Sequence, residues 1–367
     1  MIQTRTMMKL EDIILVGWDI ILMMSFVESA QENLVENVKE DILHKKKEKG
    51  FLIMEKINVL SLFDGISCGQ VALHRAGIAV NNYYAYEIEQ HAIDITRYNY
   101  PNTIECGDVT TADFTQYKGI DLLIGGSPCT NFSQAKNHTA KNKKETDINQ
   151  GTGWELFMQY VRALKEAKPK YFLYENNYRI SKNIIDNMSK ELGVQPILIN
   201  SGLVSAQNRK RLYWTNIPNV TQPIDKGILV KDIIIDDPSL LKVFDDRLRN
   251  TLIKCKNYIK YDLGGKGHYS QQDRLYYLNG KAPTVPRCRT ESKFNVWLGE
   301  ETYKKTCPIE IERLQTLPDN YTQFGIDKNG NTYEIKKTNR FEAIGNGWTV
   351  DVITHIFKGL KGDKRND

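Results

Sequence analysis

The sequence lacks the features that mark a metal-bound or disulfide-bonded protein. It has no C-x-x-C pair, and no histidines stand at the spacing of zinc ligands. Its six cysteines are scattered: Cys68, Cys106, Cys129, Cys255, Cys288 and Cys307. We therefore expect a reduced, intracellular protein without a structural metal.

Three further signals are missing. There is no G-x-G-x-x-G fingerprint, which argues against an NAD-dependent dehydrogenase. No internal repeat is visible. The net charge is only +5 over 367 residues, so the overall charge gives no argument for nucleic acid and the distribution of charge must supply it.

No apolar run reaches the roughly 20 residues that a membrane span needs. The longest candidate, "IILVGWDIILMMSFV", is interrupted by Asp19. Arg5 and Lys9 precede the run and Ser29-Ala30 follow it, which leaves a signal peptide as an alternative. We favour a helical extension of unknown role over residues 1–53, with Met54 as a natural start for the adjoining domain.

From Ile57 onward, short β-rich runs alternate with helical stretches, a pattern that predicts a parallel sheet covered by helices. The 41% hydrophobic content is sufficient for a full core. Expected strands are Ile57–Leu62, Val80–Tyr86, Asp121–Ile124, Tyr171–Tyr174 and Pro196–Asn200. Expected helices are Gln70–Ala76, Glu89–Tyr98, Trp154–Ala167 and Ser181–Leu192, with two more in the last 60 residues.

The periodicity fades after Pro223. Residues 251–299 hold nine Lys or Arg and three Asp or Glu, so their local charge of +6 exceeds that of the whole chain. Such a run is either a solvated face or a surface for an acidic partner. We expect a catalytic domain over 54–220, completed by 304–367, and a smaller irregular domain over 221–303.

A glycine-bearing turn and three acids suggest a nucleoside site. Gly65 and Gly69 follow the first strand and would let a ligand approach the start of a helix. Glu87 follows the second strand, 23 positions after Asp64, and Asp108 stands where the third would end. Taken singly, each acid is more typical of a turn or cap. Together they favour a nucleoside that carries a positive group.

Cys129 ends the stretch "GGSPC", on a loop at the carboxyl end of a strand. A free cysteine is usually a small buried hydrophobe, but this edge is where open α/β sheets place ligands. A polar stretch with several lysines follows and is typical of a lid. Glu175 ends a later strand on the same edge, and Arg209 and Arg211 stand two apart, so that both point to one face.

Nine ordered blocks resemble the cytosine-5 DNA methyltransferases, from Ile57 to about Leu360. They are "FDGISCG", "YEIE", "GDVT", "GGSPCTNFS", "GTGWELF", "ENN", "QNRKR", "RLQTLPDNY" and "GNGWTV". The blocks are most similar to the eukaryotic de novo enzymes and their phage or prophage relatives. The resemblance implies a Rossmann-like S-adenosylmethionine-dependent methyltransferase sheet with helices on both faces.

The resemblance also implies a role for each matching residue. Cys129 would add to carbon 6 of a flipped-out cytosine, Glu175 would protonate ring N3, and Arg211, supported by Arg209, would face the base carbonyl. S-adenosylmethionine would be bound by Phe63, Asp64, Gly65, Ile66, Ser67, Cys68, Glu87, Asp108, Val109, Asn346, Gly347 and Trp348.

Double-stranded DNA is the partner that the resemblance implies, with residues 221–303 as target-recognition domain. The side chains expected to contact it are Ser133, Lys136, Gln271, Gln272, Arg274, Arg287, Arg289 and Thr290. Arginine suits guanine and glutamine suits adenine. The resemblance further implies a cytoplasmic, nucleoid-associated protein that needs no metal, with a cognate restriction endonuclease as a possible partner.

Two departures from the family pattern are Thr130 after the cysteine, where glutamine is common, and Asn177 after "EN", where valine is common. They predict altered fine geometry. Two other functions stay open, a catalytically weak DNA-binding homologue and an RNA cytosine-5 methyltransferase of the same fold. Retention of Cys129, Glu175 and both arginines argues against the first, and the full-size segment after "QNRKR" favours DNA over RNA.

Overall fold

The computed structural model describes residues 56–128, 152–244, 252–260, 274–288, 294–299 and 302–361. The expected extension over residues 1–53 lies outside them. Within those ranges no helix is long and apolar enough to cross a membrane. The same ranges contain no group of three His, Cys, Asp or Glu side chains that could hold a metal ion.

A seven-stranded sheet in the order β3-β2-β1-β4-β5-β7-β6 forms the centre of the fold. The strands are β1 Ile57–Leu62, β2 Val80–Tyr86, β3 Ile104–Gly107, β4 Leu122–Gly125, β5 Tyr171–Asn177, β6 Ile197–Asn200 and β7 Lys210–Thr215. Strand β7 runs antiparallel to β5 and β6, and the other pairs are parallel. Because strand order reverses between β1 and β4, the carboxyl ends of these strands form a crevice.

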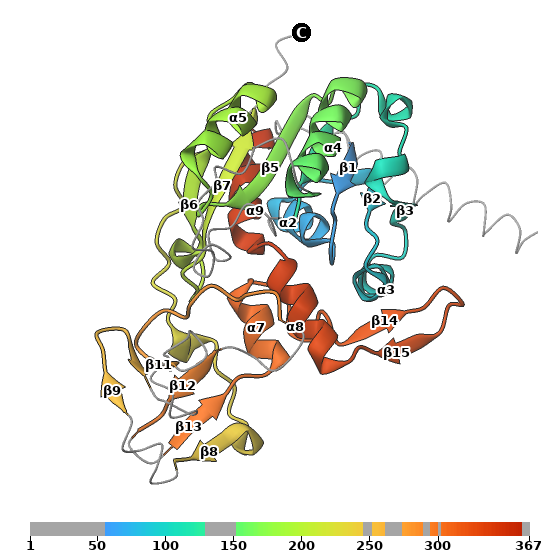
Figure 1. The fold of residues 1–367 in the computed structure, drawn as a ribbon. Coiled ribbons are helices and arrows are strands. Elements are labelled where there is room, and N and C mark those ends of the chain that lie inside the picture. Colours follow the sequence, from blue (N-terminus) through green and yellow to red (C-terminus); the bar gives the residue numbers. More distant parts are fainter. Residues whose placement is uncertain are drawn as a thin grey trace, which may run out of the picture. The chain divides into compact units, whose positions relative to one another are not determined.

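Helices cover both faces of this sheet (Figure 1). The described helices are α2 Cys68–Ala76, α3 Gln90–Asn99, α4 Thr152–Ala167, α5 Lys182–Leu192, α7 Pro308–Leu314, α8 Lys337–Asn346 and α9 Val350–Phe357. Of these, α7 and α8 pack against each other and lie away from the faces of the large sheet (Figure 1). Right-handed crossovers place α2 and α3 on one face and α4 and α5 on the other. Helix α9, near the end of the chain, packs against α2 near its beginning. The predicted α/β fold is confirmed.

The core lies between the sheet and α4 and α5. Tyr160, Tyr174 and Trp214 are fully buried there, and their rings contact one another at centroid distances of 4.8 and 5.8 Å. Buried rings of this size each stabilise the fold by about 1.5–3 kcal/mol. Helix α5 begins at Lys182, one residue after the predicted start, because the Ser181 hydroxyl accepts a hydrogen bond from Ile184 N and caps the helix. It ends at Gly193, whose φ of +73° suits glycine.

The segment expected to be irregular contains a second sheet of six short strands, in the order β8-β13-β12-β11-β10-β9. They are β8 Leu241–Val243, β9 Ile253–Lys254, β10 Tyr258–Lys260, β11 Arg274–Tyr277, β12 Asn295–Trp297 and β13 Thr302–Lys305. Phe244, Ile259 and Leu275 form its small core. A buried ion pair, Lys304 Nζ to Glu310 Oε1 at 2.5 Å, joins β13 to α7. The boundaries expected for this domain stay a prediction.

A hairpin that was not predicted from the sequence follows α7, although Asn329-Gly330, a pair typical of hairpin turns, stands in its loop. Strands β14 (Phe324–Ile326) and β15 (Thr332–Glu334) pair antiparallel. Strand β14 packs against α3, and Figure 1 shows the hairpin beside that helix. The Tyr333 hydroxyl donates to Asp94 Oδ2 at 2.5 Å, which fixes the hairpin to α3.

Candidate active site

A cavity of about 460 Å³ opens at the carboxyl edge of the large sheet. This volume lies within the range of small-molecule sites, about 300–1,000 Å³. Of the twelve residues expected to bind the cofactor, all but Ser67 line the cavity: Phe63, Asp64, Gly65, Ile66, Cys68, Glu87, Asp108, Val109, Asn346, Gly347 and Trp348. The structure therefore brings together residues that are almost 300 positions apart in the chain.

The turn between β1 and α2 forms one wall. Phe63, Gly65 and Ser67 all have positive φ angles, of 58°, 62° and 55°. A Cβ atom on Gly65 would meet no atom within 4 Å, so glycine there serves the backbone conformation and leaves its surface open to a ligand. Gly65 N donates to Glu87 Oε2 at 2.8 Å, which ties this turn to the end of β2.

Asp64 braces the same turn from inside. Its carboxylate accepts hydrogen bonds from Ser61 Oγ at 2.6 Å, from Tyr83 OH at 2.7 Å and from the Ser67 hydroxyl. Burial raises the pKa of the Asp64 carboxyl, and the three hydroxyls act in the opposite direction. The side chain of Asp64 thus stabilises the conformation of the turn. Ser67 contributes through its hydrogen bond to Asp64 and does not line the cavity.

Glu87 presents a carboxylate at the end of β2. Backbone N–H groups of Gly65, Ile88 and Glu89 donate to it at 2.8, 2.8 and 2.9 Å. Burial raises the pKa of the Glu87 carboxyl, and these three donors partly offset the shift. The orientation of Glu87 is therefore fixed before any ligand arrives, as suits an acceptor for a pair of hydroxyl groups.

Two other wall positions are held by local contacts. Asp108 accepts from Thr110 N at 2.8 Å and so caps the short turn that begins at Val109, whose side chain is buried. On the opposite side, Cys68 lies beneath Gly347, where a Cβ atom would stand 3.1 Å from Sγ. Burial raises the pKa of the Cys68 thiol to about 12, so Cys68 is a packing residue and no nucleophile.

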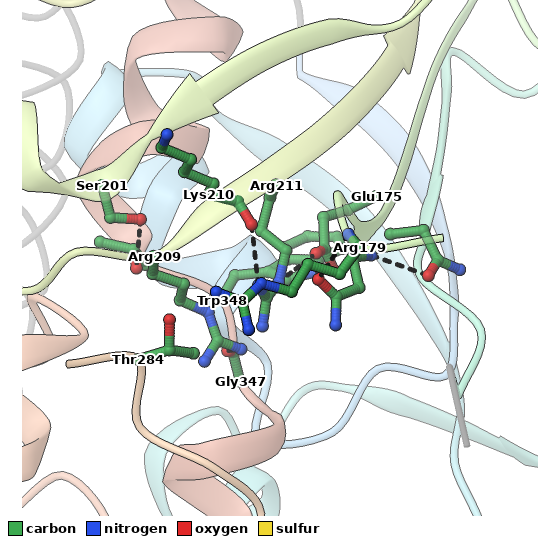
Figure 2. Close-up of polar contacts among 12 residues, drawn as sticks. Glu175, Arg179, Ser201, Arg209, Lys210, Arg211, Thr284, Gly347 and Trp348 are labelled. Carbon is green, nitrogen blue, oxygen red and sulfur yellow. Dashed lines mark hydrogen bonds and ion pairs between the residues drawn. The ribbon is translucent and has the colours of Figure 1, made fainter. Parts of the chain in front are cut away.

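Glu175 lies deeper in the cavity, with 12% of its side chain exposed. Its Oε2 accepts a hydrogen bond from Trp348 Nε1 at 3.1 Å, and its Oε1 lies 2.9 Å from Arg211 Nε (Figure 2). The contact with Arg211 is within ion-pair distance but lacks hydrogen-bond geometry, so Oε1 has no hydrogen-bond donor in the described part of the chain. This buried oxygen is ion-paired with Arg211 but has no hydrogen-bond donor among the described residues, so a hydrogen bond from a ligand would satisfy it.

Arg209 and Arg211 both line the cavity, although Arg209 precedes β7, and their guanidinium groups differ in surroundings. Arg211 contacts Glu175 and donates to Lys210 O at 2.9 Å. Arg209 is 5% exposed and donates to three backbone carbonyls, Val285 O at 2.9 Å, Gly345 O at 3.2 Å and Gly347 O at 3.1 Å. Arg209 thereby fixes the wall, and its predicted support of Arg211 at the base stays a prediction.

Cys129, Ser133 and Lys136 lie outside the described residues, as does the rest of the expected lid. The chain that leads to Cys129 does line the cavity, at Gly126, Ser127 and Pro128. A Cβ atom on Gly126 would stand 3.1 Å from Glu175 Oε2, so this segment contacts Glu175 closely.

Of the residues expected to contact DNA, only Arg274 and Arg287 are described; Gln271, Gln272, Arg289 and Thr290 lie outside. Arg274 stacks on the Tyr258 ring, 4.5 Å from its centroid, in the second sheet. Arg287 lines the cavity and pairs with Glu89 at 3.2 Å and with Glu342 at 2.5 Å. The cavity therefore brings Arg287, but not Arg274, together with the cofactor residues. Base reading by either arginine stays a prediction.

Two features of the site could not be predicted from any sequence motif. The segment Thr284–Arg287 lines the cavity although it belongs to none of the nine blocks. The hydrogen bond from Trp348 to Glu175 joins two blocks that lie 173 positions apart. Only the tryptophan itself, in the "GNGWTV" block, was a signal.

Comparison with known proteins assigns the family. Residues 57–362 match the family model of the C-5 cytosine-specific DNA methylases. The chain belongs to this family. The family expected from nine sequence blocks is thus confirmed, and so is the expectation of an enzyme.

Individual relatives agree with the assignment. The chain is 34% identical over 176 residues to the orphan methyltransferase M.SPRI of Bacillus phage SPR, a match that covers 45% of this chain and 38% of the phage protein. It is 24% identical over 319 residues to the type II methyltransferase M.NlaX of Neisseria lactamica, with 83% and 96% covered. This chain thus aligns with well under half of the phage relative, but with nearly all of M.NlaX.

The fold is also shared with solved structures. The Dnmt2 methyltransferase of S. pombe superimposes with a TM-score of 0.55 at 15% identity, covering 84% of this chain and 99% of the other. This likeness confirms the Rossmann-like architecture. The family uses S-adenosylmethionine as methyl donor, and the cavity fits that molecule: Glu87 offers an oriented carboxylate for ribose hydroxyls, and Gly65 leaves space for its backbone to approach.

Proposed function

We propose that this protein is a DNA (cytosine-5) methyltransferase that methylates a flipped-out cytosine in duplex DNA through a covalent bond to Cys129. The observation that carries the proposal is Glu175 Oε1, a buried oxygen that is ion-paired with Arg211 but lacks a hydrogen-bond donor among the described residues. This oxygen stands on the cavity wall that leads to Cys129. A pyrimidine ring supplies the missing partner.

The cofactor side is proposed residue by residue. The turn from Phe63 to Cys68 would cradle S-adenosylmethionine, Glu87 would accept from its ribose hydroxyls, and Asp108 and Val109 would contact the adenine. Asn346, Gly347 and Trp348 would close the pocket. When bound, S-adenosylmethionine supplies the methyl group. The chain's own task is to hold the donor beside the base and to exclude water.

Chemistry at the base would run through the residues opposite. The Cys129 thiolate adds to carbon 6, and the electron pair displaced from the ring is taken up as Glu175 delivers a proton to N3. Arg211 donates to the base carbonyl and so stabilises the charge that develops there. After carbon 5 takes the methyl group, its proton leaves to solvent, the sulfur is eliminated from carbon 6, and Glu175 recovers its proton.

The proposed macromolecular partner is duplex DNA. A cytosine within a duplex is out of reach of such a cavity, so it must be extruded at a cost of a few kcal/mol. Basic side chains on the phosphates and a second domain against the duplex would offset that cost. Nucleoid association and a cognate restriction endonuclease remain further parts of this proposal.

The test uses purified full-length protein, labelled S-adenosylmethionine, and duplex DNA or RNA as acceptor. We expect methyl transfer to DNA, its abolition by Cys129→Ala, and a covalent adduct at Cys129 on DNA that contains 5-fluorocytosine. An alanine variant with unchanged rate, or an adduct on another residue, refutes the mechanism. Transfer to RNA alone refutes the substrate. Base-resolution mapping of DNA from expressing cells then gives the target site.

A further inference from the structure

We propose that Trp348 is a positioning residue: its indole N–H holds Glu175 Oε2 so that Oε1 is presented to the substrate ring. The inference rests on the proposed function, because it assigns a task to Glu175 in that reaction. It adds to the expected place of Trp348 in the cofactor pocket a second task, on the base side of the cavity.

The two oxygens of the Glu175 carboxylate have different partners. Trp348 Nε1 donates to Oε2 at 3.1 Å, whereas Oε1 lies beside Arg211 Nε at 2.9 Å and has no hydrogen-bond donor among the described residues. With Oε2 held, rotation of the carboxylate about its last bond would break the indole contact. Trp348 therefore fixes the plane of the carboxylate, and with it the position at which the second oxygen can meet the base.

A tryptophan can position a neighbour only if it is itself fixed. Hydrogen bonds hold the backbone on both sides of Trp348. Gly347 O accepts from Arg209 at 3.1 Å and from Gln315 Nε2 at 3.0 Å. The Thr349 hydroxyl accepts from Ser201 Oγ at 2.9 Å and donates to Gln315 Oε1 at 2.8 Å. Each of these flanking bonds involves buried side chains.

The third side of the arrangement is Gly126. A Cβ atom at this position would lie 3.1 Å from Glu175 Oε2 and 3.4 Å from Trp348 Nε1. The absence of a side chain lets the segment that leads to Cys129 pass directly beside the pair. The cofactor pocket, the proposed proton donor and the approach to the proposed nucleophile thus meet at one hydrogen bond, which Figure 2 shows from the side of Arg209 and Arg211.

The first test asks whether the bond exists in solution. The chain has five tryptophans, so an indole ¹⁵N–¹H spectrum has up to five signals, and Trp348→Phe identifies that of Trp348 by its loss. We expect Glu175→Ala to shift this signal far more than any other indole signal. A Trp348 signal that stays in place overturns the inference, whether or not the protein methylates DNA.

The second test measures what the bond does. Trp348→Phe keeps an aromatic ring but removes the donor, and a hydrogen bond to a charged group is worth about tenfold to a hundredfold in rate. We expect the single-turnover rate to fall by about that factor in the wild-type background, and by less than about threefold in Glu175→Gln, since coupled residues are not additive. The dissociation constant for S-adenosylmethionine should stay within about threefold, because the ring is retained.

Trp214→Phe is the matched control, because Trp214 Nε1 also makes a buried hydrogen bond, to Ser189 Oγ at 2.9 Å in the core. It should lower the melting temperature and leave the rate unchanged. Equal losses from Trp348→Phe in both backgrounds, or a loss confined to cofactor affinity, overturn the inference. Failure of the unaltered protein to methylate DNA contradicts the proposed function instead, and the indole signal still reports on the contact.

Discussion

Replacing Arg209 by methionine should destabilise the protein and weaken its binding of S-adenosylmethionine. The side chain is 5% exposed and donates to Val285 O, Gly345 O and Gly347 O. Gly347 O also accepts from Gln315, so it keeps a partner. Two buried carbonyls then lose a donor, at about 1–3 kcal/mol each. Relief from burying a charged guanidinium offsets part of this cost, which leaves a loss of about 2–4 kcal/mol.

Equilibrium unfolding in urea, followed by circular dichroism, gives the free energy of unfolding, and calorimetry gives the cofactor's dissociation constant. Arg211→Met is the control, because Arg211 contacts Glu175 and not the wall carbonyls. It should cost only about 1 kcal/mol of stability but reduce kcat at least about tenfold. If the free energy of unfolding of Arg209→Met stays within about 0.5 kcal/mol of the wild-type value, the contacts of Arg209 with the carbonyls do not stabilise the fold as expected.

Three further outcomes are expected. Because burial raises the pKa of the Glu87 carboxyl, Glu87 loses its charge at a higher pH than usual. Affinity for S-adenosylmethionine should therefore fall as the pH drops towards that pKa. Calorimetry between about pH 5 and pH 8 measures this profile, and Glu87→Gln should flatten it. Gly126→Ala should lower kcat by more than about tenfold and the melting temperature by only a few degrees, because its Cβ would stand 3.0 Å from Glu175 O and 3.1 Å from Oε2. Removal of residues 1–53 should leave methyl transfer unchanged, and an inactive or insoluble product would contradict the view that the core does not need them.

Much of the large sheet could be predicted from the sequence. Strands β1 and β2 have the predicted bounds, and α5 ends before Gly193 as expected and begins one residue after the predicted start at Ser181. These elements are long, periodic and capped by residues with a definite local preference, so local signals suffice. The convergence of the residues expected to bind the cofactor could also be predicted, since carboxyl ends of parallel strands share one edge.

The rest depended on contacts between distant segments. Glu175 was expected to end its strand, but β5 continues to Asn177, because β7 pairs with it up to Asn177 and Arg211. The strands of the second sheet have two to four residues, too few for a periodic pattern to show. The task of Arg209 was likewise hidden, because backbone carbonyls leave no trace in a sequence.

Because α9, near the end of the chain, packs against α2 near its beginning, this part of the fold is completed late in synthesis on the ribosome. Asp64 and Trp348 face the same cavity but are 348 − 64 = 284 residues apart. At a synthesis rate of roughly 5–20 residues per second, about 14 to 57 s separate their translation. A nascent chain that has formed only its first strands therefore lacks Trp348 and its hydrogen bond to Glu175, and the cavity is complete only when Trp348 has been synthesised.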